Sequence, residues 1–284
     1  MSEFSAHTQW QAELYDEHPP LNPFEKLHRE IGFALVCRPK DLATKNYLEQ
    51  FKVNDQTKIL DMGCASGFLL QRISKTFGSQ GTGIDVSKVL IDKAKQEDPN
   101  NQYFLADASK LPFPDNTFDL VTSFDNLEHI QEYKKVIKEM VRVLKPGGTI
   151  LLNTINKHNR FTFDWLLEKL GSDYHMRRAG HVKELFFDPQ DIKVLFEEAG
   201  LENTKIRLFD ATFILIMDCA LYIFLMAIEK LANVTNSYHR LGRISLTITN
   251  IASKLSLPVL EKCDTVIIKH GFSNAFFLTG VKSK

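Results

Sequence analysis

The sequence has few of the residues that mark metal-cluster, secreted or nucleic-acid-binding proteins. Its 4 cysteines include no Cys-x-x-Cys pair, which argues against a zinc cluster and a disulfide framework. Its 35 basic residues balance 35 acidic ones, so no overall field attracts nucleic acid. The first residues lack the basic and apolar regions of a secretion signal. We therefore expect a cytoplasmic protein that does not act on nucleic acid.

Short β-rich runs alternate with helical patterns between residues 58 and 153, which indicates a parallel sheet covered by helices. A later segment, DPQDIKVLFEEAG, predicts a helix with Asp188 as N-cap and Pro189 at its first position. The seven runs are KILDM, GTGID, YFLAD, FDLVTSF, GTILLNT, LENTKIRLF and NAFFLTGVK. They predict an α/β fold, a Rossmann-like doubly wound seven-stranded sheet with an α-helical insertion before the last strand.

The chain divides into three predicted parts. Residues 1–50 form an N-terminal helical lid segment, in which Trp10, Tyr15 and Phe24 are expected to form one wall over the ligand site. Residues 51–209 and 270–284 form the sheet domain, and residues 210–269 form an α-helical insertion or cap.

A glycine-rich turn follows the first strand, from Asp61 through Gly63 and Ala65 to Gly67. Such a turn lets a ligand approach the backbone at a helix N-terminus, although the pattern alone is a weak signal. Asp61 would repel a pyrophosphate but would attract a cationic ligand such as an amino-acid ammonium group. The turn therefore favours a cationic ligand over a dinucleotide.

Two further acids follow the next two strands. Asp85 is placed to accept hydrogen bonds from a ribose diol, and Asp107 is placed to accept from an adenine amino group. Amino acid, ribose and adenine together indicate S-adenosylmethionine. The alternative is that the acids only cap strand ends in an inactive domain. The predicted cofactor-binding residues are Asp61, Gly63, Ala65, Gly67, Asp85, Val86, Asp107, Ala108 and Phe124.

With these residues the chain resembles the class I S-adenosylmethionine-dependent methyltransferases. The matching pieces lie over roughly residues 57–155, in the family's order: ILDMGCASG, GIDVS, ADASKLPFPDNTFDLV, NLEHI and VLKPGGTILLNT. The family usually has glycine at the position of Ala65, where we expect reduced tolerance rather than lost binding. The resemblance implies that the protein is an enzyme that transfers the methyl group of S-adenosylmethionine.

The segment FDNLEHI after the fourth strand holds candidate catalytic groups. If a helix begins there, Asp125, Glu128 and His129 share one face. Two carboxylates and an imidazole suit a divalent metal of intermediate hardness. In the alternative interpretation, Asp125 and Glu128 form a capping box, and His129 is a polar group or base facing the substrate.

This segment is similar to the E-x-x-E-H arrangement of the ubiquinone-biosynthesis, polyprenyl-catechol O-methyltransferases and of small-RNA 2′-O-methyltransferases, whose metal site adds a downstream histidine. The matching residue here is His181, although Lys183 and Asp191 depart from the quinone family's pattern. The resemblance implies His129, Glu128 and His181 as catalytic residues, and a divalent metal on Asp125, Glu128, His129 and His181.

One long apolar run, residues 211–228, contains a single charge, Asp218. A charge at the centre of a membrane span costs about 2.5 to 3.5 kcal/mol, and residues 241–260 are too polar to supply a returning span. Two interpretations stay open: a buried cap helix, and an apolar lid or membrane-surface element that admits a lipid-like acceptor. In the second, the protein is peripheral on a membrane.

The expected activity is O-methylation of an apolar or lipid-like small molecule. The alternatives are a carbon or nitrogen methyltransferase of a small metabolite, and a protein that binds S-adenosylmethionine without catalysis. RNA methylation is a further option, but the neutral charge and the apolar insertion speak against it. The acceptor and the oligomeric state do not follow from the sequence.

Overall fold

A computed structural model describes residues 6–17, 24–34, 39–159, 165, 169, 185–209 and 212–284, without the side chains of residues 6, 212–215, 218, 219 and 257. His181 and the side chain of Asp218 therefore lie outside the described part of the chain.

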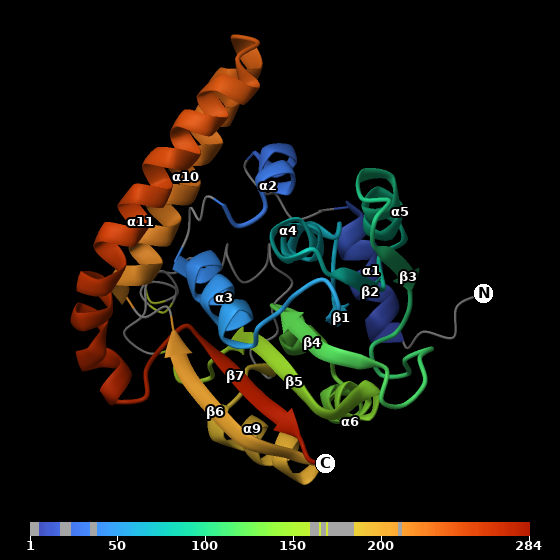
Figure 1. Cartoon of the computed structure of the whole chain (residues 1–284). Coiled ribbons are helices and arrows are strands. Elements are labelled where there is room, and N and C mark those ends of the chain that lie inside the picture. The colour runs from blue at the N-terminus through green and yellow to red at the C-terminus, as the bar shows by residue number, and fades with distance from the viewer. Residues whose placement is uncertain are drawn as a thin grey trace.

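The centre of the molecule is a seven-stranded sheet in the order β3-β2-β1-β4-β5-β7-β6 (Figure 1). The first five strands run parallel, and β7 pairs antiparallel with both β5 and β6. This arrangement confirms the predicted fold class. The strands are β1 (Lys58–Met62), β2 (Gln80–Asp85), β3 (Gln102–Leu105), β4 (Phe118–Phe124), β5 (Leu144–Ile155), β6 (Leu201–Phe209) and β7 (Ala275–Lys282).

Helices cover both faces of the sheet because its central strands are apolar on both sides. Leu60 and Met62 of β1 belong to one buried cluster, whereas Ile59 belongs to the cluster on the other face. The sheet-covering helices are α3 (Pro39–Gln50), α4 (Phe68–Phe77), α5 (Lys88–Glu97), α6 (Tyr133–Val143) and α9 (Pro189–Glu198).

The start of α9 confirms the predicted helix signal. The side chain of Asp188 accepts a hydrogen bond of 2.9 Å from the Gln190 backbone N–H, and Pro189 occupies the first turn, where its missing N–H costs nothing.

Two N-terminal helices, α1 (Ala6–Glu17) and α2 (Glu25–Ile31), pack against the sheet-covering helices. Contacts join α1 to α5, and α2 to α4. Phe24, which precedes α2, is fully buried and packs against Tyr238, with ring centroids 5.3 Å apart. Phe24 therefore anchors α2 to the C-terminal helices and does not form a wall over the strand ends.

Between β6 and β7 lie α10 (Thr212–Val234) and α11 (Tyr238–Lys269), which pack side by side and which we call the helical hairpin. Its turn projects beyond the rest of the molecule (Figure 1). Within the described residues, no helix combines the length and the apolar character needed to cross a membrane.

Candidate active site

Strand register brings the predicted acids to one edge of the sheet. Asp61 of β1 pairs in register with Gly83 of β2 and Thr122 of β4, so Asp85 and Phe124 end their strands beside it. The carboxyl ends of parallel strands are where ligands bind in open α/β sheets. The candidate site is therefore this edge.

Asp61 is buried and is held by one neighbour. Its Oδ1 accepts a hydrogen bond of 2.7 Å from the Thr122 hydroxyl. Burial raises the pKa of the Asp61 carboxyl to about 7; the Thr122 bond opposes this shift, and the charge of Asp85 adds to it. A bound cation would favour the ionised form. Asp61 thus fits the ammonium group of the methionine moiety.

The glycine-rich turn takes left-handed backbone angles. Gly63 and Gly67 both have φ of 73°, and a Cβ on Gly63 would come within 2.4 Å of the Asn126 side chain. Ala65 also has a positive φ, 47°, which is unfavourable for a residue with a Cβ. Its backbone N–H donates to Asp85 Oδ2 at 2.9 Å. The turn keeps its shape at Ala65 at the cost of backbone strain.

The other two acids bind backbone groups and retain accepting capacity. Asp85 Oδ1 accepts from the Ser87 N–H at 2.9 Å, and Asp107 Oδ1 accepts from the Ser109 N–H at 2.7 Å. A carboxylate oxygen has a second lone pair, so both remain able to accept from a hydroxyl or amino group. The remaining predicted positions, Val86, Ala108 and Phe124, directly follow Asp85, follow Asp107 and end β4. The assignment of these residues to the cofactor stays a prediction.

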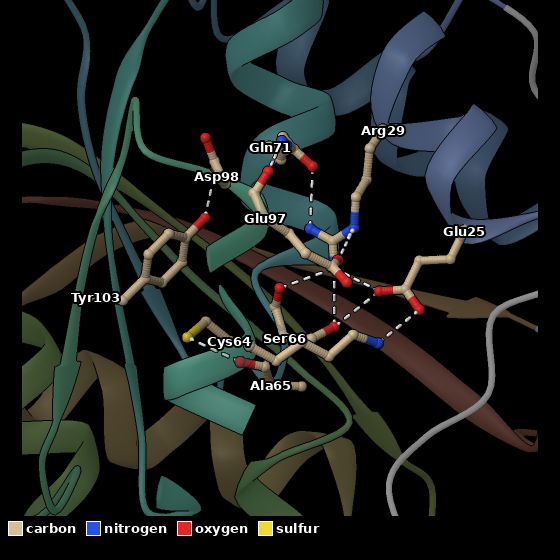
Figure 2. A network of polar contacts seen from close by, with 10 residues as sticks. Glu25, Arg29, Cys64, Ala65, Ser66, Gln71, Glu97, Asp98 and Tyr103 are labelled. Atoms are coloured by element: carbon tan, nitrogen blue, oxygen red, sulfur yellow. Dashed lines mark hydrogen bonds and ion pairs between the residues drawn. The ribbon is translucent and has the colours of Figure 1, made fainter. Parts of the chain in front are cut away.

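A buried arginine from α2 holds the glycine-rich turn (Figure 2). Arg29 Nη2 donates to the carbonyl oxygen of Ser66 at 2.8 Å and to its hydroxyl at 2.9 Å, and Nη1 donates to Gln71 at 3.0 Å. Arg29 also forms ion pairs with Glu25 and Glu97. This cluster links α2, the turn and α5, and sequence reasoning missed it because its members are far apart in the chain.

Glu128 is the most buried acid beside the strand ends. It lies in the short helix η1 (Leu127–His129) and is 0% exposed. The Thr154 hydroxyl donates to its Oε2 at 2.7 Å, while Oε1 has no hydrogen-bond partner among the described residues. Burial, and then the charge of Asp125, raise the pKa of Glu128 to about 8. The carboxyl therefore gains or loses a proton near neutral pH.

Helix α1 covers these residues. The ring of Tyr15 meets that of His129 edge to face at 5.8 Å, and His7 Nε2 lies 2.9 Å from the His129 carbonyl oxygen. Burial raises the pKa of the Tyr15 hydroxyl far above its usual value, and the charges of Glu128 and Asp85 add to the shift. Tyr15 therefore lies close to acids that belong to two strand ends, Asp85 of β2 and Glu128 after β4, as expected of a residue in the wall over the site. Trp10 is 44% exposed.

The three described residues of the expected metal cluster, Asp125, Glu128 and His129, form no group that could hold a metal ion. Asp125 is exposed, has a left-handed φ of 46° and pairs with Lys40, whereas Glu128 and His129 are buried. The segment forms a short 3-10 turn rather than an α-helix, and its N-cap is Asn126, so the capping box was wrong as well. Among the described residues, no group of three candidate ligands could hold a metal ion; His181 lies outside them.

A large cavity within the described part of the chain lies elsewhere. It measures about 1180 Å³ and lies between α2, α4, α5 and the hairpin, lined by residues such as Lys26, Lys75 and Met226. Neither Asp61 nor Glu128 lines it. The strand ends remain the candidate active site, because Asp61, Asp85 and Glu128 lie together there and α1 contacts His129.

Comparison with known proteins decides the family. A family described as a methyltransferase domain matches residues 60–152. Demethylmenaquinone methyltransferase of Staphylococcus aureus is 30% identical over 183 residues, which cover 58% of this chain and 76% of that protein. The chain belongs to the S-adenosylmethionine-dependent methyltransferases. The enzyme uses S-adenosylmethionine as its methyl donor, and the buried acid at Asp61 is consistent with this cation.

Solved structures of other proteins share the fold of this methyltransferase. Phosphoethanolamine N-methyltransferase 2 of Haemonchus contortus, in complex with S-adenosyl-L-methionine, has a TM-score of 0.61 at 18% identity, covering 99% of this chain and 61% of that one. The [4+2]-cyclase SpnF has a TM-score of 0.54 at 22% identity, covering 85% of this chain and 80% of its own. Because proteins of different activities share the fold, the acceptor has to be argued from the site.

Proposed function

We propose that the enzyme methylates an oxygen atom of an apolar or lipid-like small molecule. The observation that carries the proposal is Glu128, a buried carboxyl with a pKa of about 8 and an Oε1 without a partner among the described residues. A hydroxyl acceptor has to lose its proton as it is methylated, and a base with a pKa near the working pH is best suited to take it.

The bound cofactor supplies an electrophilic methyl group, and transfer requires an in-line approach of the acceptor. Glu128 receives the acceptor's proton at Oε1, while Thr154 holds Oε2 and fixes the carboxyl plane. Tyr15 and His129 close the site from the side of α1 and exclude water.

The proposed class of acceptor rests on the similarity of this chain to known proteins and on the apolar run between β6 and β7. The relative at 30% identity is named for demethylmenaquinone, an apolar substrate of that protein. The resemblance of NLEHI to the ubiquinone-biosynthesis O-methyltransferases points the same way. Transfer to carbon or nitrogen is the alternative; an amine that binds in its neutral form has a free lone pair and needs no base for the attack.

A labelling experiment tests the proposal. The purified enzyme is incubated with methyl-labelled S-adenosylmethionine and a lipid-and-metabolite extract, with and without a chelator, and the labelled product is identified by mass. We expect one labelled apolar product carrying an O-methyl group, formed equally with chelator. A water-soluble amine as the only product would contradict the proposal. Loss of turnover with chelator would show that the reaction needs a metal.

A further inference from the structure

Helix α11 carries an exposed apolar stripe along its length. Six residues spaced three, four or seven apart lie on one side of the helix, with exposed fractions from 49% to 73%. They are Ile244, Ile248, Ile251, Leu255, Val259 and Val266. A stripe this long is unusual for a helix on the surface of a monomeric protein.

Helix α10 carries a second stripe of the same kind. Ile216, Ile223, Leu231 and Val234 are 45% to 80% exposed, at spacings that keep them on one side of the helix. The opposite side of α10 holds the buried residues Leu225 and Ala232. Both helices of the hairpin therefore present apolar side chains that the described chain does not cover.

The inner side of α11 is mostly polar, although Leu246 is also buried there. Three polar residues there are at most 1% exposed: Ser245, Thr249 and Ser253. Two of them satisfy their hydroxyls within the helix: Thr249 donates to the Ser245 carbonyl at 3.0 Å, and Ser245 donates to the Gly242 carbonyl at 2.9 Å. The isoleucines thus face outward although the inner side offers a place for apolar residues. None of the residues that the structure describes covers them.

Basic residues dominate the exposed charge on the described side chains of the hairpin. The described acids are partnered or buried: Glu229 accepts from the Phe24 N–H at 2.9 Å, Glu261 is 40% exposed but pairs with Arg207, and Asp264 is 0% exposed. The exposed basic residues are Lys230, Arg240, Arg243, Lys254, Lys262 and Lys269. The whole chain has no net charge, so this bias is local to the hairpin.

We propose that the helical hairpin docks on the surface of an anionic lipid bilayer. An apolar stripe flanked by lysine and arginine is the pattern of helices that lie in the headgroup region. Lys262 lies in line with Leu255 and Val266, at spacings of seven and four residues. A packed protein seam would bury its ammonium group, whereas at a bilayer its stem extends to the headgroups.

The docking surface is joined to the candidate active site through α2. Phe24, which precedes α2, packs on Tyr238 of α11, and its backbone N–H donates to Glu229 of α10. Arg29 of α2 donates to Ser66 of the glycine-rich turn. Docking would therefore hold the site close to a bilayer, where an apolar acceptor dissolves. The surface itself does not depend on the proposed acceptor, because lipid binding requires no methyl transfer.

Vesicle sedimentation of the full chain tests the proposal. Vesicles of phosphatidylcholine with about 30% phosphatidylglycerol are compared with phosphatidylcholine alone, at low and at high salt. We expect salt-sensitive binding to the anionic vesicles. The variant Ile248→Ser/Ile251→Ser/Leu255→Ser should bind at least about tenfold more weakly. Lys254→Glu/Lys262→Glu should remove the preference for the anionic lipid.

The matched control is Val194→Ser on α9, which is 49% exposed, as Ile244 is, and lies outside the hairpin. It should bind as the unchanged protein does, and all variants should keep their cofactor affinity, which shows that they fold. Three outcomes would overturn the proposal: no vesicle binding, binding that the triple variant leaves unchanged, or a dimer that forms without lipid and disappears in the triple variant. Vesicle binding without methylation of an apolar product would count against the proposed function alone.

Discussion

The sheet edge and the helical hairpin handle polarity in opposite ways. At the sheet edge, polar groups are buried: Asp61 and Glu128 lie among apolar strands, and their pKa values rise to about 7 and about 8. On the hairpin, apolar groups are exposed, such as Ile223 at 67% and Leu255 at 73%. Both arrangements cost stability in the isolated chain. In our two proposals, a ligand binds at each region: the sheet edge performs the chemistry, and the hairpin locates the enzyme at a bilayer.

The largest expected effect is on catalysis at the sheet edge. Glu128→Gln keeps the side-chain volume but removes the proton acceptor, so kcat should fall about a thousandfold, within the usual range for loss of a general base. Glu132→Gln is the matched control, since Glu132 is exposed and pairs with Lys135 at the surface, and its kcat should not change. Equal activities of the two variants would place the base elsewhere.

The next effect concerns the arginine that holds the glycine-rich turn. Arg29→Met removes the ion pairs to Glu25 and Glu97 and the donor to Ser66, while Glu25 keeps its ion pair with Lys93, so the free energy of unfolding should decrease by about 2 kcal/mol. Cofactor affinity should decrease too. Urea unfolding measures the first and calorimetry the second. Arg243→Met on the hairpin, where the charge is exposed, should leave the free energy of unfolding unchanged. An equal decrease in Arg243→Met would contradict the difference between the two regions.

Cofactor binding should depend on pH through Asp61. Its carboxyl is protonated below about pH 7 and then no longer attracts a cation, so affinity should be about eightfold weaker at about pH 6 than at about pH 7.5. Because this pKa lies above that of the unfolded chain, the free protein loses stability as pH rises from about 4 to about 7, and bound cofactor offsets the loss. Asp61→Asn should give weak binding that is flat over this interval. A flat profile for the unchanged enzyme would rule out the ammonium contact.

The smallest effect concerns backbone strain in the turn. Ala65→Gly relieves a positive φ and should stabilise the fold by about 1 kcal/mol, less the entropy that glycine adds to the unfolded chain. Thermal unfolding measures it. Destabilisation would mean that the methyl group of Ala65 makes contacts that outweigh the strain.

Residues at strand ends could be predicted because the order of strands fixes their position. Asp61, Asp85 and Asp107 each follow a β-rich run, and parallel strands bring such residues to one edge. Asp125 was misplaced because its spacing to Glu128 and His129 was interpreted as α-helical. The chain instead makes a left-handed turn at Asp125, followed by a 3-10 helix. Such a local choice of backbone angles leaves no mark in residue spacing.

Long-range contacts and the direction of a helix face could not be predicted. Arg29 lies 37 residues from Ser66 in the sequence, and neither segment contains a pattern that predicts their contact. The polar residues of α11 made that segment look unlike a membrane element. Periodicity shows that Thr249 and Ile248 lie on different faces, but it does not say which face packs inward; the structure buries the polar one.

One measurement tests both halves of the account together. The same lipid extract is supplied as acceptor in anionic vesicles and in nonionic detergent micelles, and methyl transfer is followed for three proteins: the unchanged enzyme, Glu128→Gln and Ile248→Ser/Ile251→Ser/Leu255→Ser. We predict that Glu128→Gln is inactive in both and that the triple variant is impaired only with vesicles. Equal impairment of the triple variant in detergent, or an active Glu128→Gln, would contradict the division of chemistry and location between the two regions.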